Sequence, residues 1–598
     1  MPNNDNLDRM MDFENAKAIV LQELGQIETI YELSTEEKEQ LKYNVHSTYL
    51  SVDTEFLGKE GVVQSITFHI HLPMSFPMVM PKISLPVVEL EKYRSFPHID
   101  EKGGICLFDD DTTRTNPENP VGILLSCLRR AKEIIEQGLA KTNYNDYKEE
   151  FLVYWLYRYN GEPDLDMAVL QLFSGDPDPA KVNMIKLDEP LHLFSYVVHQ
   201  NDENATTFLN YLGFRKLSYK DQPICHLGPV SWNYVPPFNL RNKDVKQIVS
   251  RLPKEVVNRF KNFINSGKTP KFLTASVLLN GRYHLIGWRH ADFKVVGKRK
   301  GFRNGKITNY ELLSSLQAND PVVRTSPQEY SPDQKQLRSI GKIFDAKGNK
   351  KFLVAGLGSI GSNLIYFLNT YNDPEFRLVD PDDLSLDNIN RHLLGFIYSA
   401  RGKAVGVKSY LIHKNPFQKV EYRKESVLDV MRNAPEFVNN ADYIFIAIGK
   451  TNIEQYLGSL VESGKITKPM FILWVEPYLS AGHAVYLHPG SRPFRSYFED
   501  YELFKYNVVH RDAYLSNHPL LHLKQAGCQT TYVPYGMVDI TLFLSGIFPY
   551  INKIISHGRK DSCALSWVGD LDQLRALNIP LSDFATSVNE RTITIHEG

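Results

Sequence analysis

Cysteine is scarce in this chain, and no two cysteines are close together. Five cysteines are spread over 598 residues, and none of them forms a Cys-x-x-Cys pair. This spacing excludes a zinc site built from two such pairs and argues against a disulfide framework. A functional cysteine is therefore expected to act as a nucleophile. The five positions are Cys106, Cys127, Cys225, Cys528 and Cys563.

Net charge and long hydrophobic runs are also nearly absent. The formal charge of −1 argues against a globally electrostatic binder of nucleic acid or membranes. No apolar run of about 18 residues and no N-terminal signal pattern are present. Hydrophobic and charged contents of 42% and 23% are ordinary for a soluble protein of several domains. We therefore expect a cytoplasmic protein with no membrane partner and no direct nucleic-acid partner.

A glycine-rich turn is the strongest local signal in the sequence. An apolar strand is expected at 352–355, and the glycines Gly356, Gly358 and Gly361 lead from it into helix-spaced apolar residues. Glycine permits a tight turn and a close approach of the backbone to phosphate, while the helix N-terminus offers unpaired N–H groups. The pattern predicts a phosphate cradle. A second strand at 376–379 delivers Asp380, an acid that can hold ribose hydroxyls.

The glycine-rich turn and Asp380 alone do not identify which nucleotide the protein binds. A hydride-transferring NAD enzyme or a bare Rossmann module would have the same glycines and the same acid. The residues after Asp380 distinguish between these classes: they include Asp382, Asn388 and Arg391, with Lys408 further on.

This combination resembles the signature of ubiquitin-activating, ThiF-like and MoeB-like adenylating enzymes. The spacing of acid, Asn and Arg agrees with that signature, whereas about four residues are inserted before Lys408. The resemblance implies ATP rather than NAD, with Asp380 on the ribose and Arg391 and Lys408 on the triphosphate. Fixed cations suit the chemistry, because a carboxylate attacks the α-phosphate while pyrophosphate leaves.

Magnesium is expected with ATP, but its ligands stay unassigned. The family places an acid after the fourth strand, and here the segment 441–452 has no carboxylate at the end of its strand. Either ATP phosphates, water and a neutral side chain hold Mg²⁺, or a remote acid replaces the missing one.

The N-terminal region is expected to be α+β. Helix-spaced apolar positions run from about 11 to 33, and residues 66–72 alternate apolar and polar as a strand does. The run from Ile99 to Leu107, with Gly103, Ile105 and Cys106, resembles the active-site segment of ubiquitin-conjugating enzymes. This resemblance makes Cys106 the catalytic cysteine and places His98 where the family has the asparagine that supports the oxyanion.

A buried core cysteine is the alternative for Cys106. The glycines before it and the polar residues after it favour a surface loop, where thiol chemistry is possible. Cys127, in contrast, lies among apolar residues at helical spacing and is expected in the core.

Near the C-terminus, Cys528 stands in an acid- and aromatic-rich segment. It resembles the crossover loop of bacterial activating enzymes, in which a cysteine takes the acyl group from the adenylate. Cys563, expected in a polar loop, is the competing candidate. Arg338 resembles the arginine that family members extend across a dimer to the neighbouring ATP, although an ordinary surface arginine fits equally well.

These observations predict a multidomain protein of α+β and α/β class. The expected parts are a ubiquitin-conjugating-like domain at 1–146, a bridging α+β domain at 147–330 and a Rossmann-like ThiF-type adenylation domain at 331–598. Most of the chain, about 1–145 and 331–598, resembles the fused conjugating and activating enzymes of bacterial anti-phage cyclic-nucleotide signalling (CBASS) operons, whereas the bridging part resembles no known family.

The resemblance implies the substrate and the partners. The implied substrate is the C-terminal glycine of a cGAS-like nucleotidyltransferase or a ubiquitin-like protein. The acyl group would pass through Cys528 and Cys106 to a target lysine, and the adenylation domain would pair as a homodimer. A nucleotide-binding scaffold without catalysis and a sulfur-carrier adenylyltransferase remain the alternatives.

Overall fold

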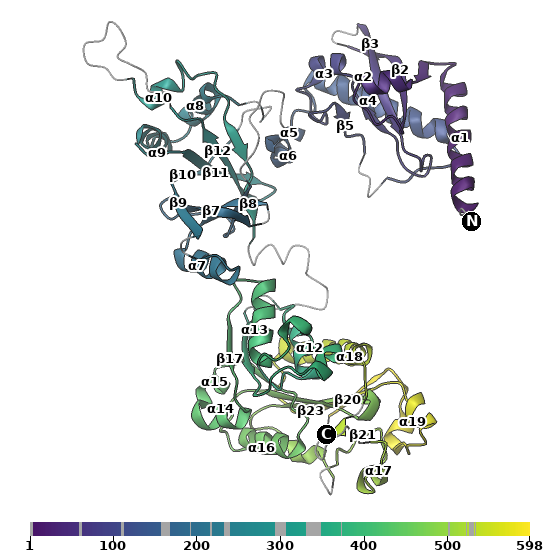
Figure 1. The fold of residues 1–598 in the computed structure, drawn as a ribbon, viewed down its shortest axis with the longest axis vertical. Coiled ribbons are helices and arrows are strands. Elements are labelled where there is room, and N and C mark those ends of the chain that lie inside the picture. Colours follow the sequence, from purple (N-terminus) through teal and green to yellow (C-terminus); the bar gives the residue numbers. More distant parts are fainter. Residues whose placement is uncertain are drawn as a thin grey trace. The chain divides into compact units, whose positions relative to one another are not determined.

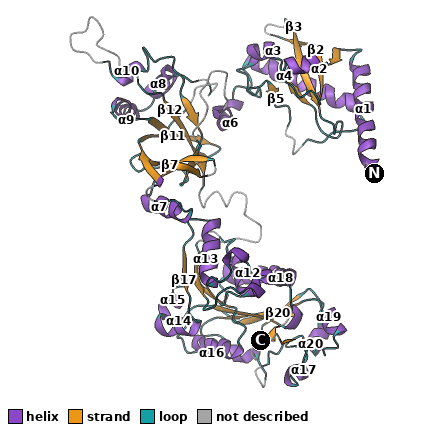
Figure 2. Ribbon diagram, in the orientation of Figure 1, coloured by secondary structure: helices purple, strands orange, loops and turns teal. Residues whose placement is uncertain are grey.

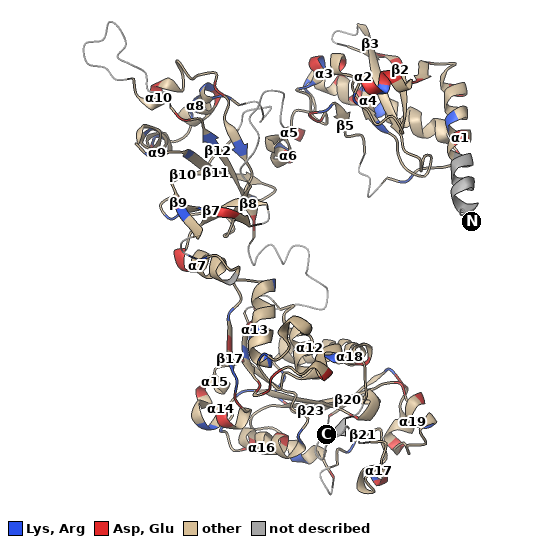
Figure 3. Cartoon of the chain, in the orientation of Figure 1, with Lys and Arg blue, Asp and Glu red and all other residues tan. Residues whose placement is uncertain are grey.

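The computed structural model describes most of the chain. The described residues are 4–58, 62–108, 113–156, 168–191, 193–215, 218–232, 238, 240–293, 307–330, 349–371, 373–499, 503–521, 523–524, 531–532 and 534–597. They form two compact units, Met1–Asn201 with Leu217–Tyr330, and Asp202–Lys216 with Ser331–Gly598 (Figure 1). Acidic and basic side chains are interspersed in both units (Figure 3). Cys528 and Arg338 lie outside the described residues.

The first unit begins with an antiparallel sheet covered by helices. Its strands follow the order β1-β2-β3-β4-β5, and α1 packs beside α4. The predicted helical segment at 11–33 ends earlier, because residues after Leu24 turn into a strand that pairs with β2. The elements are α1 (Asn4–Leu24), β1 (Thr29–Glu32), α2 (Thr35–Gln40), β2 (Thr48–Leu57), β3 (Val63–Leu72), β4 (Lys82–Ser84), α3 (Val87–Tyr93), β5 (Gly104–Ile105) and α4 (Pro120–Ala140).

The core of this region lies between the sheet and the two long helices. Phe13 and Val20 of α1 and Leu124 of α4 are buried with Phe68 and Ile70 of β3. The alternation at 66–72 therefore marks a strand with one face in the core, as the sequence predicts.

The remainder of the first unit contains two further sheets. They have the orders β10-β11-β12-β13 and β14-β6-β8-β7-β9. Asn280 and Gly281 both have positive φ, 49° and 76°, and form the hairpin turn that joins β11 to β12, as the dipeptide Asn-Gly favours. The elements are α5 (Asp146–Glu149), α6 (Phe151–Leu156), β6 (Val169–Gln171), β7 (Asn183–Leu191), β8 (Phe194–His199), β9 (Tyr219–Gln222), β10 (Ile224–Pro229), α8 (Asn242–Ser250), α9 (Lys254–Asn265), β11 (Lys271–Leu279), β12 (Arg282–His290), α10 (Asn309–Leu312), β13 (Val323–Thr325) and β14 (Gln328–Glu329).

The second unit is a three-layer α/β structure (Figure 2). Its sheet has the order β17-β16-β15-β18-β19-β20-β23-β24, and the strands from β17 to β19 are parallel. Helices α12, α13 and α18 pack on one face, and α14, α15 and α16 on the other. One contribution comes from the middle of the sequence, since Phe208 of α7 (Asp202–Tyr211) stacks on Phe417.

The elements of the second unit after α7 are β15 (Lys351–Ala355), α12 (Ser359–Leu368), β16 (Glu375–Val379), η3 (Leu386–Arg391), η4 (Phe396–Tyr398), α13 (Lys403–Lys414), β17 (Val420–Arg423), α14 (Val427–Asn433), α15 (Pro435–Asn439), β18 (Tyr443–Ile446), α16 (Thr451–Glu462), β19 (Met470–Val475), η5 (Pro477–Leu479), β20 (Ala481–Leu487), η6 (Phe494–Tyr497), α17 (Arg511–Leu515), β21 (Leu523–Lys524), β22 (Thr531–Tyr532), α18 (Met537–His557), β23 (Cys563–Val568), α19 (Asp572–Ala576), α20 (Asp583–Ser587) and β24 (Ile593–His596).

The strand order reverses between β15 and β18. From β15 the chain proceeds to β16 and β17 on one side, and then returns to place β18 on the other side. The loops after the carboxyl ends of β15 and β18 therefore border a crevice, which is where doubly wound sheets bind ligands. Gly356 follows β15, and Gly449 lies in the loop after β18.

Helix α18 is the most apolar long helix in the described part of the chain. It is long and apolar enough to cross a membrane, but half of its most apolar window is buried within the protein. Phe543, Leu544 and Ile547 of this helix lie in the same core as α12. Its packing is that of a core helix.

Candidate active sites

Cys106 lies at the surface of the first unit, directly after β5. Its side chain is exposed, and its N–H donates to the carbonyl of His98 over 2.8 Å. Gly103 has a φ of 91°, and a Cβ there would lie 2.7 Å from the Leu85 carbonyl, so the turn before the cysteine requires glycine. Local sequence and close packing together therefore present the thiol on a loop.

His98 is held by two short helices that follow the sheet. Its φ is 64°, in the left-handed region, and its N–H donates to the Tyr154 hydroxyl over 2.9 Å. Its imidazole Nε2 lies 2.8 Å from Oδ2 of Asp146. The imidazole of His98 is thus oriented by α5. Its backbone N–H is held by α6, and its carbonyl by the N–H of Cys106.

The sequence motifs did not point to Asp146 or Tyr154. Asp146 lies at the expected domain boundary, and Tyr154 lies beyond it. Helix α5 is fixed by Tyr147, whose hydroxyl donates to the carbonyl of Ser95. Helix α6 is fixed by Trp155, whose indole N–H donates to the Thr325 carbonyl over 3.1 Å. The aromatic-rich run from 144 to 155 was the available signal for a packed segment.

The three glycines of the cradle have different physical roles. Gly356 has a φ of 85°, and a Cβ there would lie 2.5 Å from the Ala447 carbonyl. A Cβ on Gly361 would lie 1.8 Å from the Gly356 carbonyl. A Cβ on Gly358 would meet nothing within 4 Å, although this residue caps α12. The space in front of Gly358 and the N–H groups of the helix start fit a phosphate.

Asp380 is buried at the end of β16 and accepts hydrogen bonds from the loop itself. Its Oδ2 accepts from the Leu357 N–H over 2.6 Å and its Oδ1 from the Asp382 N–H over 2.9 Å. Burial raises the pKa of Asp380, while Lys403 and the two N–H groups oppose that rise. This acid therefore braces the glycine turn in addition to any contact with ribose.

Lys403, at the start of α13, was missed in the sequence. Its Nζ lies 3.1 Å from Oδ2 of Asp382, and the residue is buried. Lys408, one turn further along, lies with Nζ 5.3 Å from the Tyr422 ring centroid, and neither of the two lysines lines the cavity described below. The sequence contained a signal for Lys403. Aligning Lys408 with the family signature requires an insertion of about four residues, whereas Lys403, five positions earlier, needs almost none.

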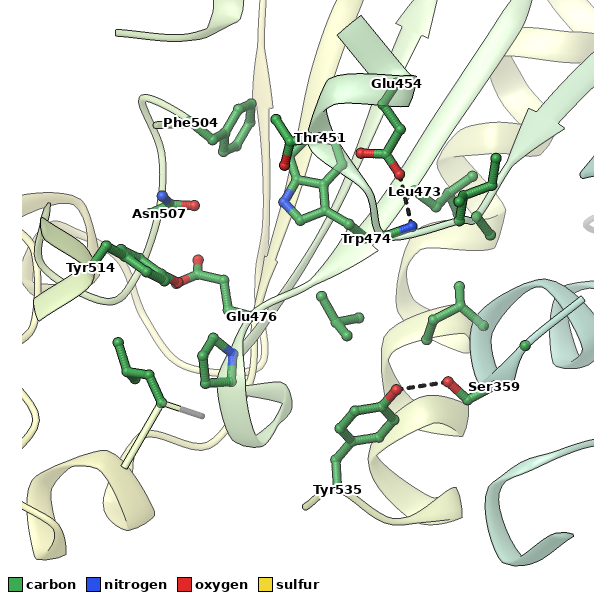
Figure 4. Close-up of a pocket in the computed structure, with 18 of the residues that line it drawn as sticks. Ser359, Thr451, Glu454, Leu473, Trp474, Glu476, Phe504, Asn507, Tyr514 and Tyr535 are labelled. Atoms are coloured by element: carbon green, nitrogen blue, oxygen red, sulfur yellow. Dashed lines mark hydrogen bonds between the residues drawn. The ribbon is translucent and has the colours of Figure 1, made fainter. Parts of the chain in front are cut away.

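Arg391 lines a cavity of about 590 Å³ at the crevice. Its Nη2 donates to Oδ1 of Asn388 over 3.0 Å, and its Cζ lies 5.2 Å from the centroid of the Tyr535 ring. Tyr535 also shares a hydrogen bond of 2.7 Å with Ser359 at the start of α12 (Figure 4). The structure thus brings Arg391 and Gly358 to one cavity, with Asn388 fixing the guanidinium.

The cavity wall opposite the glycine-rich turn is aromatic, and hydrogen bonds hold it in place. Trp474, Phe504 and Tyr514 line it together with Glu476 (Figure 4). The buried carboxylate of Glu476 accepts from the N–H groups of Val508 and Val509 over 2.6 and 2.9 Å, and from the Tyr514 hydroxyl over 3.1 Å. This wall is therefore positioned by hydrogen bonds within the fold.

One buried carboxylate faces the nucleotide side of the cavity. Glu454 of α16 is 4% exposed, and its Oε1 accepts from the Gly449 N–H over 2.9 Å. Burial raises its pKa to about 7, although the N–H groups of Gly449 and Lys450 favour the charged form. No cluster of three or more His, Cys, Asp or Glu in a metal-binding arrangement occurs among the described residues. A single oxygen-donor carboxylate fits Mg²⁺, because this ion is commonly held by one or two carboxylates, substrate phosphates and water.

Among the four described cysteines, Cys106 alone is exposed. The expectation of a polar loop for Cys563 is wrong, because this residue begins β23, pairs with β20 and is fully buried. Burial raises the pKa of Cys563 to about 11, that of Cys225 to about 11 and that of Cys127 to about 12. These three thiols resist ionisation. Cys127 lies in the core, as expected.

Two family models match the chain. Residues 21–161 match the prokaryotic E2 family B, and residues 335–485 match the ThiF family. The ATP-dependent ubiquitin transferase-like protein Cap2 of Pseudomonas aeruginosa (strain BWHPSA011 / Pa011) is 23% identical over 411 residues, 66% of this chain and 69% of that protein. The ThiF match implies the use of ATP.

Parts of the chain are also similar to solved structures. A selenomethionine crystal structure of PaaA is 16% identical, with a TM-score of 0.27 over 37% of this chain and 60% of that one. Escherichia coli MccB with succinimide is 16% identical, with a TM-score of 0.26 over 39% of this chain and 62% of that one. The chain thus spans less than two thirds of these solved chains.

The sequence motifs and the two family matches agree on both halves of the chain. Cys106 falls within the E2 match, and the glycine cradle and Arg391 fall within the ThiF match. The chain therefore joins an E2-like region to a ThiF-type region, the combination expected of an ATP-dependent adenylating and conjugating enzyme.

Proposed function

We propose that this protein adenylates the C-terminal glycine of a partner protein and conjugates it to a target lysine. The partner is a cGAS-like nucleotidyltransferase or a ubiquitin-like protein, and the setting is anti-phage defence. The observation that carries the proposal is that one chain has an exposed cysteine in an E2-like domain and a nucleotide-sized cavity in a ThiF-type domain.

In the adenylation half, Gly358 and the start of α12 receive phosphate, and Arg391 faces the charge that develops there. Asn388 holds the guanidinium at 3.0 Å, and Asp380 braces the loop, so these groups need little reorganisation during the reaction. Lys403 is the better-placed lysine for the triphosphate, because it lies beside Asp380 and Asp382, which follow β16 and brace the glycine loop. When bound, Mg²⁺ supplies neutralisation of phosphate charge.

A carboxylate oxygen of the partner's C-terminus attacks the α-phosphorus of ATP, and pyrophosphate leaves. The Sγ of Cys528 then attacks the acyl carbon, and AMP leaves. The Sγ of Cys106 takes the acyl group from Cys528, which regains a proton. Finally a lysine amine attacks the thioester, the amide forms, and Cys106 leaves as a thiol.

In the conjugating half, His98 is the group that acts beside the thioester. Its imidazole, oriented by Asp146 at 2.8 Å, replaces the asparagine that the family uses to support the oxyanion. The aromatic wall of the cavity formed by Trp474 and Phe504 receives the last residues of the partner's tail.

A homodimer through the adenylation domain would bring Arg338 to the neighbouring ATP, and light scattering that finds only monomer at micromolar concentration would exclude that role.

A non-reducing gel tests the proposal directly. The full chain is incubated with ATP, Mg²⁺ and a nucleotidyltransferase that ends in glycine, and pyrophosphate is measured in parallel. A thiol-sensitive adduct, followed by a thiol-resistant conjugate, is expected. The matched control is the same partner without its terminal glycine, which should give neither product.

The alternatives predict different outcomes in the same experiment. A nucleotide-binding scaffold would release no pyrophosphate, and a sulfur-carrier adenylyltransferase would release pyrophosphate without forming a conjugate. Either result would overturn the proposed function.

A further inference from the structure

The loop after β18 lacks an acidic side chain where a nucleotide site of this type needs one. Gly449 stands there with a φ of 67°, and a Cβ built on it would meet nothing within 4 Å. The loop borders the cavity that contains Gly358 and Arg391. The space beside Gly449 is therefore open, and no side chain of the loop after β18 fills it on the side of the cavity where Gly358 and Arg391 lie.

A carboxylate reaches this position from the first turns of the next helix. Glu454 lies five residues after Gly449, and its Oε1 accepts the Gly449 N–H over 2.9 Å (Figure 4). The residue lines the same cavity as Gly358, Ser359 and Arg391. The starts of α12 and α16 both border this cavity, so a phosphate chain and Glu454 would share one small volume.

The carboxylate of Glu454 has no cationic partner among the described residues. The residue is 4% exposed, and no Lys or Arg in the described part of the chain forms an ion pair with it. A buried carboxylate is costly unless a cation or several donors compensate it. Two loop N–H groups bond to Glu454, and a carboxylate offers about four lone-pair positions, so acceptor capacity is left for a cation.

We propose that Glu454 is the protein ligand of the Mg²⁺ that accompanies ATP, replacing the acid that the loop after β18 lacks. The inference rests on the proposed function. Mg²⁺ prefers oxygen ligands and retains several waters, so one carboxylate together with phosphate oxygens satisfies it. Thr451, at the start of α16, lines the same cavity and adds a hydroxyl.

Calorimetry of ATP binding tests the assignment without catalysis. ATP is titrated into the full chain with excess Mg²⁺ and separately with EDTA, and the ratio of the two dissociation constants is the readout. Wild-type protein should bind ATP more tightly with Mg²⁺. Glu454→Gln should reduce that ratio by at least about tenfold, because even indirect contacts to a metal are worth 10- to 100-fold. Its affinity in EDTA should be equal or higher, since a negative charge beside the phosphates is removed.

The variants are chosen so that misfolding does not mimic the result. The glutamine oxygen can still accept the Gly449 N–H, and an unchanged melting temperature confirms that it does. Glu462→Gln, an exposed site on the same helix, is the matched control and should keep the wild-type ratio. As a second readout, Mn²⁺ bound with ATP should show a protein-dependent change in its electron paramagnetic resonance spectrum that Glu454→Gln abolishes.

The outcomes separate the two proposals. If Glu454→Gln keeps the full Mg²⁺ enhancement and the Mn²⁺ signal, the inference is overturned while the adenylation function stands. If wild-type protein binds no ATP under either condition, the proposed function fails and this inference fails with it.

Discussion

At the residue scale, the two lysines of α13 differ in their surroundings. Lys403 lies beside Asp382 near the glycine loop, whereas Lys408 lies against Tyr422. We expect Arg391→Ala and Lys403→Ala to lose ATP–pyrophosphate exchange by about 100-fold or more, roughly 3 kcal/mol each, because each removes a fixed cation facing charge that builds in the transition state.

Lys408→Ala is the decisive comparison in the same assay. The sequence assigns the triphosphate contact to Lys408, and the structure favours Lys403. Near wild-type exchange in Lys408→Ala with loss in Lys403→Ala would support Lys403, and the reverse result would restore the assignment made from the sequence. Melting temperatures of both variants exclude unfolding as the cause.

His392 links the motif to the glycine loop through its imidazole. Its Nδ1 accepts from the Leu394 N–H over 3.0 Å, so Nε2 carries the proton and donates to the Leu357 carbonyl over 2.7 Å. Burial lowers the pKa of His392 to about 4, from the ordinary histidine value of about 6.5. The neutral ring is therefore the form that the fold requires.

A pH dependence of stability follows from this pKa. The unfolded chain takes up a proton near pH 6.5 and the folded chain only near pH 4, so the contribution of His392 is present above pH 6.5 and is lost as the pH falls towards 4. Between pH 7.5 and 5 it should decrease by about 2 kcal/mol. In urea unfolding, His392→Gln should be less stable at pH 7.5, with a smaller deficit at pH 5. A deficit that does not change with pH would contradict this account.

At the element scale, the helices α5 and α6 complete the site around Cys106. Asp146→Asn weakens one of the two contacts that orient His98, because the carboxylate charge is lost, and Tyr154→Phe removes the other. We expect both variants to form the thioester on Cys106 and to discharge it to lysine more slowly, by about tenfold, because a lost hydrogen bond to a positioned group costs about 1–3 kcal/mol. Single-turnover discharge of the preloaded thioester measures this.

A surface residue on the same sheet provides the control for these two variants. Thr67→Ala removes an exposed hydrogen bond to Asp53, on β2, and should leave discharge unchanged. Wild-type discharge in both Asp146→Asn and Tyr154→Phe would mean that the orientation of His98 has no part in the transfer.

At the scale of the whole molecule, the two halves are expected to work as a relay. Cys528→Ala should form adenylate but no thioester, and Cys106→Ala should stop with a thiol-sensitive adduct on Cys528. Joining both domains in one chain makes the second transfer intramolecular, at an effective concentration that can reach about millimolar. Peptide mapping of the trapped adduct decides the assignment, and an adduct on Cys225 or Cys563 would overturn it despite their burial.

Short-range features of this protein were predictable from the sequence. The strand that leads into Gly356, the hairpin turn at Asn280 and Gly281, and the loop that presents Cys106 depend on backbone conformations that a few adjacent residues impose. The resemblance to activating enzymes and the resemblance to conjugating enzymes likewise depend on short segments, around Gly356 and around Cys106.

Tertiary structure decided the features that join distant residues. Asp146 and Tyr154 reach His98 from beyond the expected domain boundary, Glu454 reaches Gly449 from the next helix, and Cys563 is buried by the pairing of β23 with β20. Local pattern determines which conformations a segment prefers, but packing of the sheets and helices determines which charges are buried together. The sequence by itself therefore indicated the class of chemistry through its short motifs, and the fold decided which carboxylates and thiols are buried and which distant residues contact them.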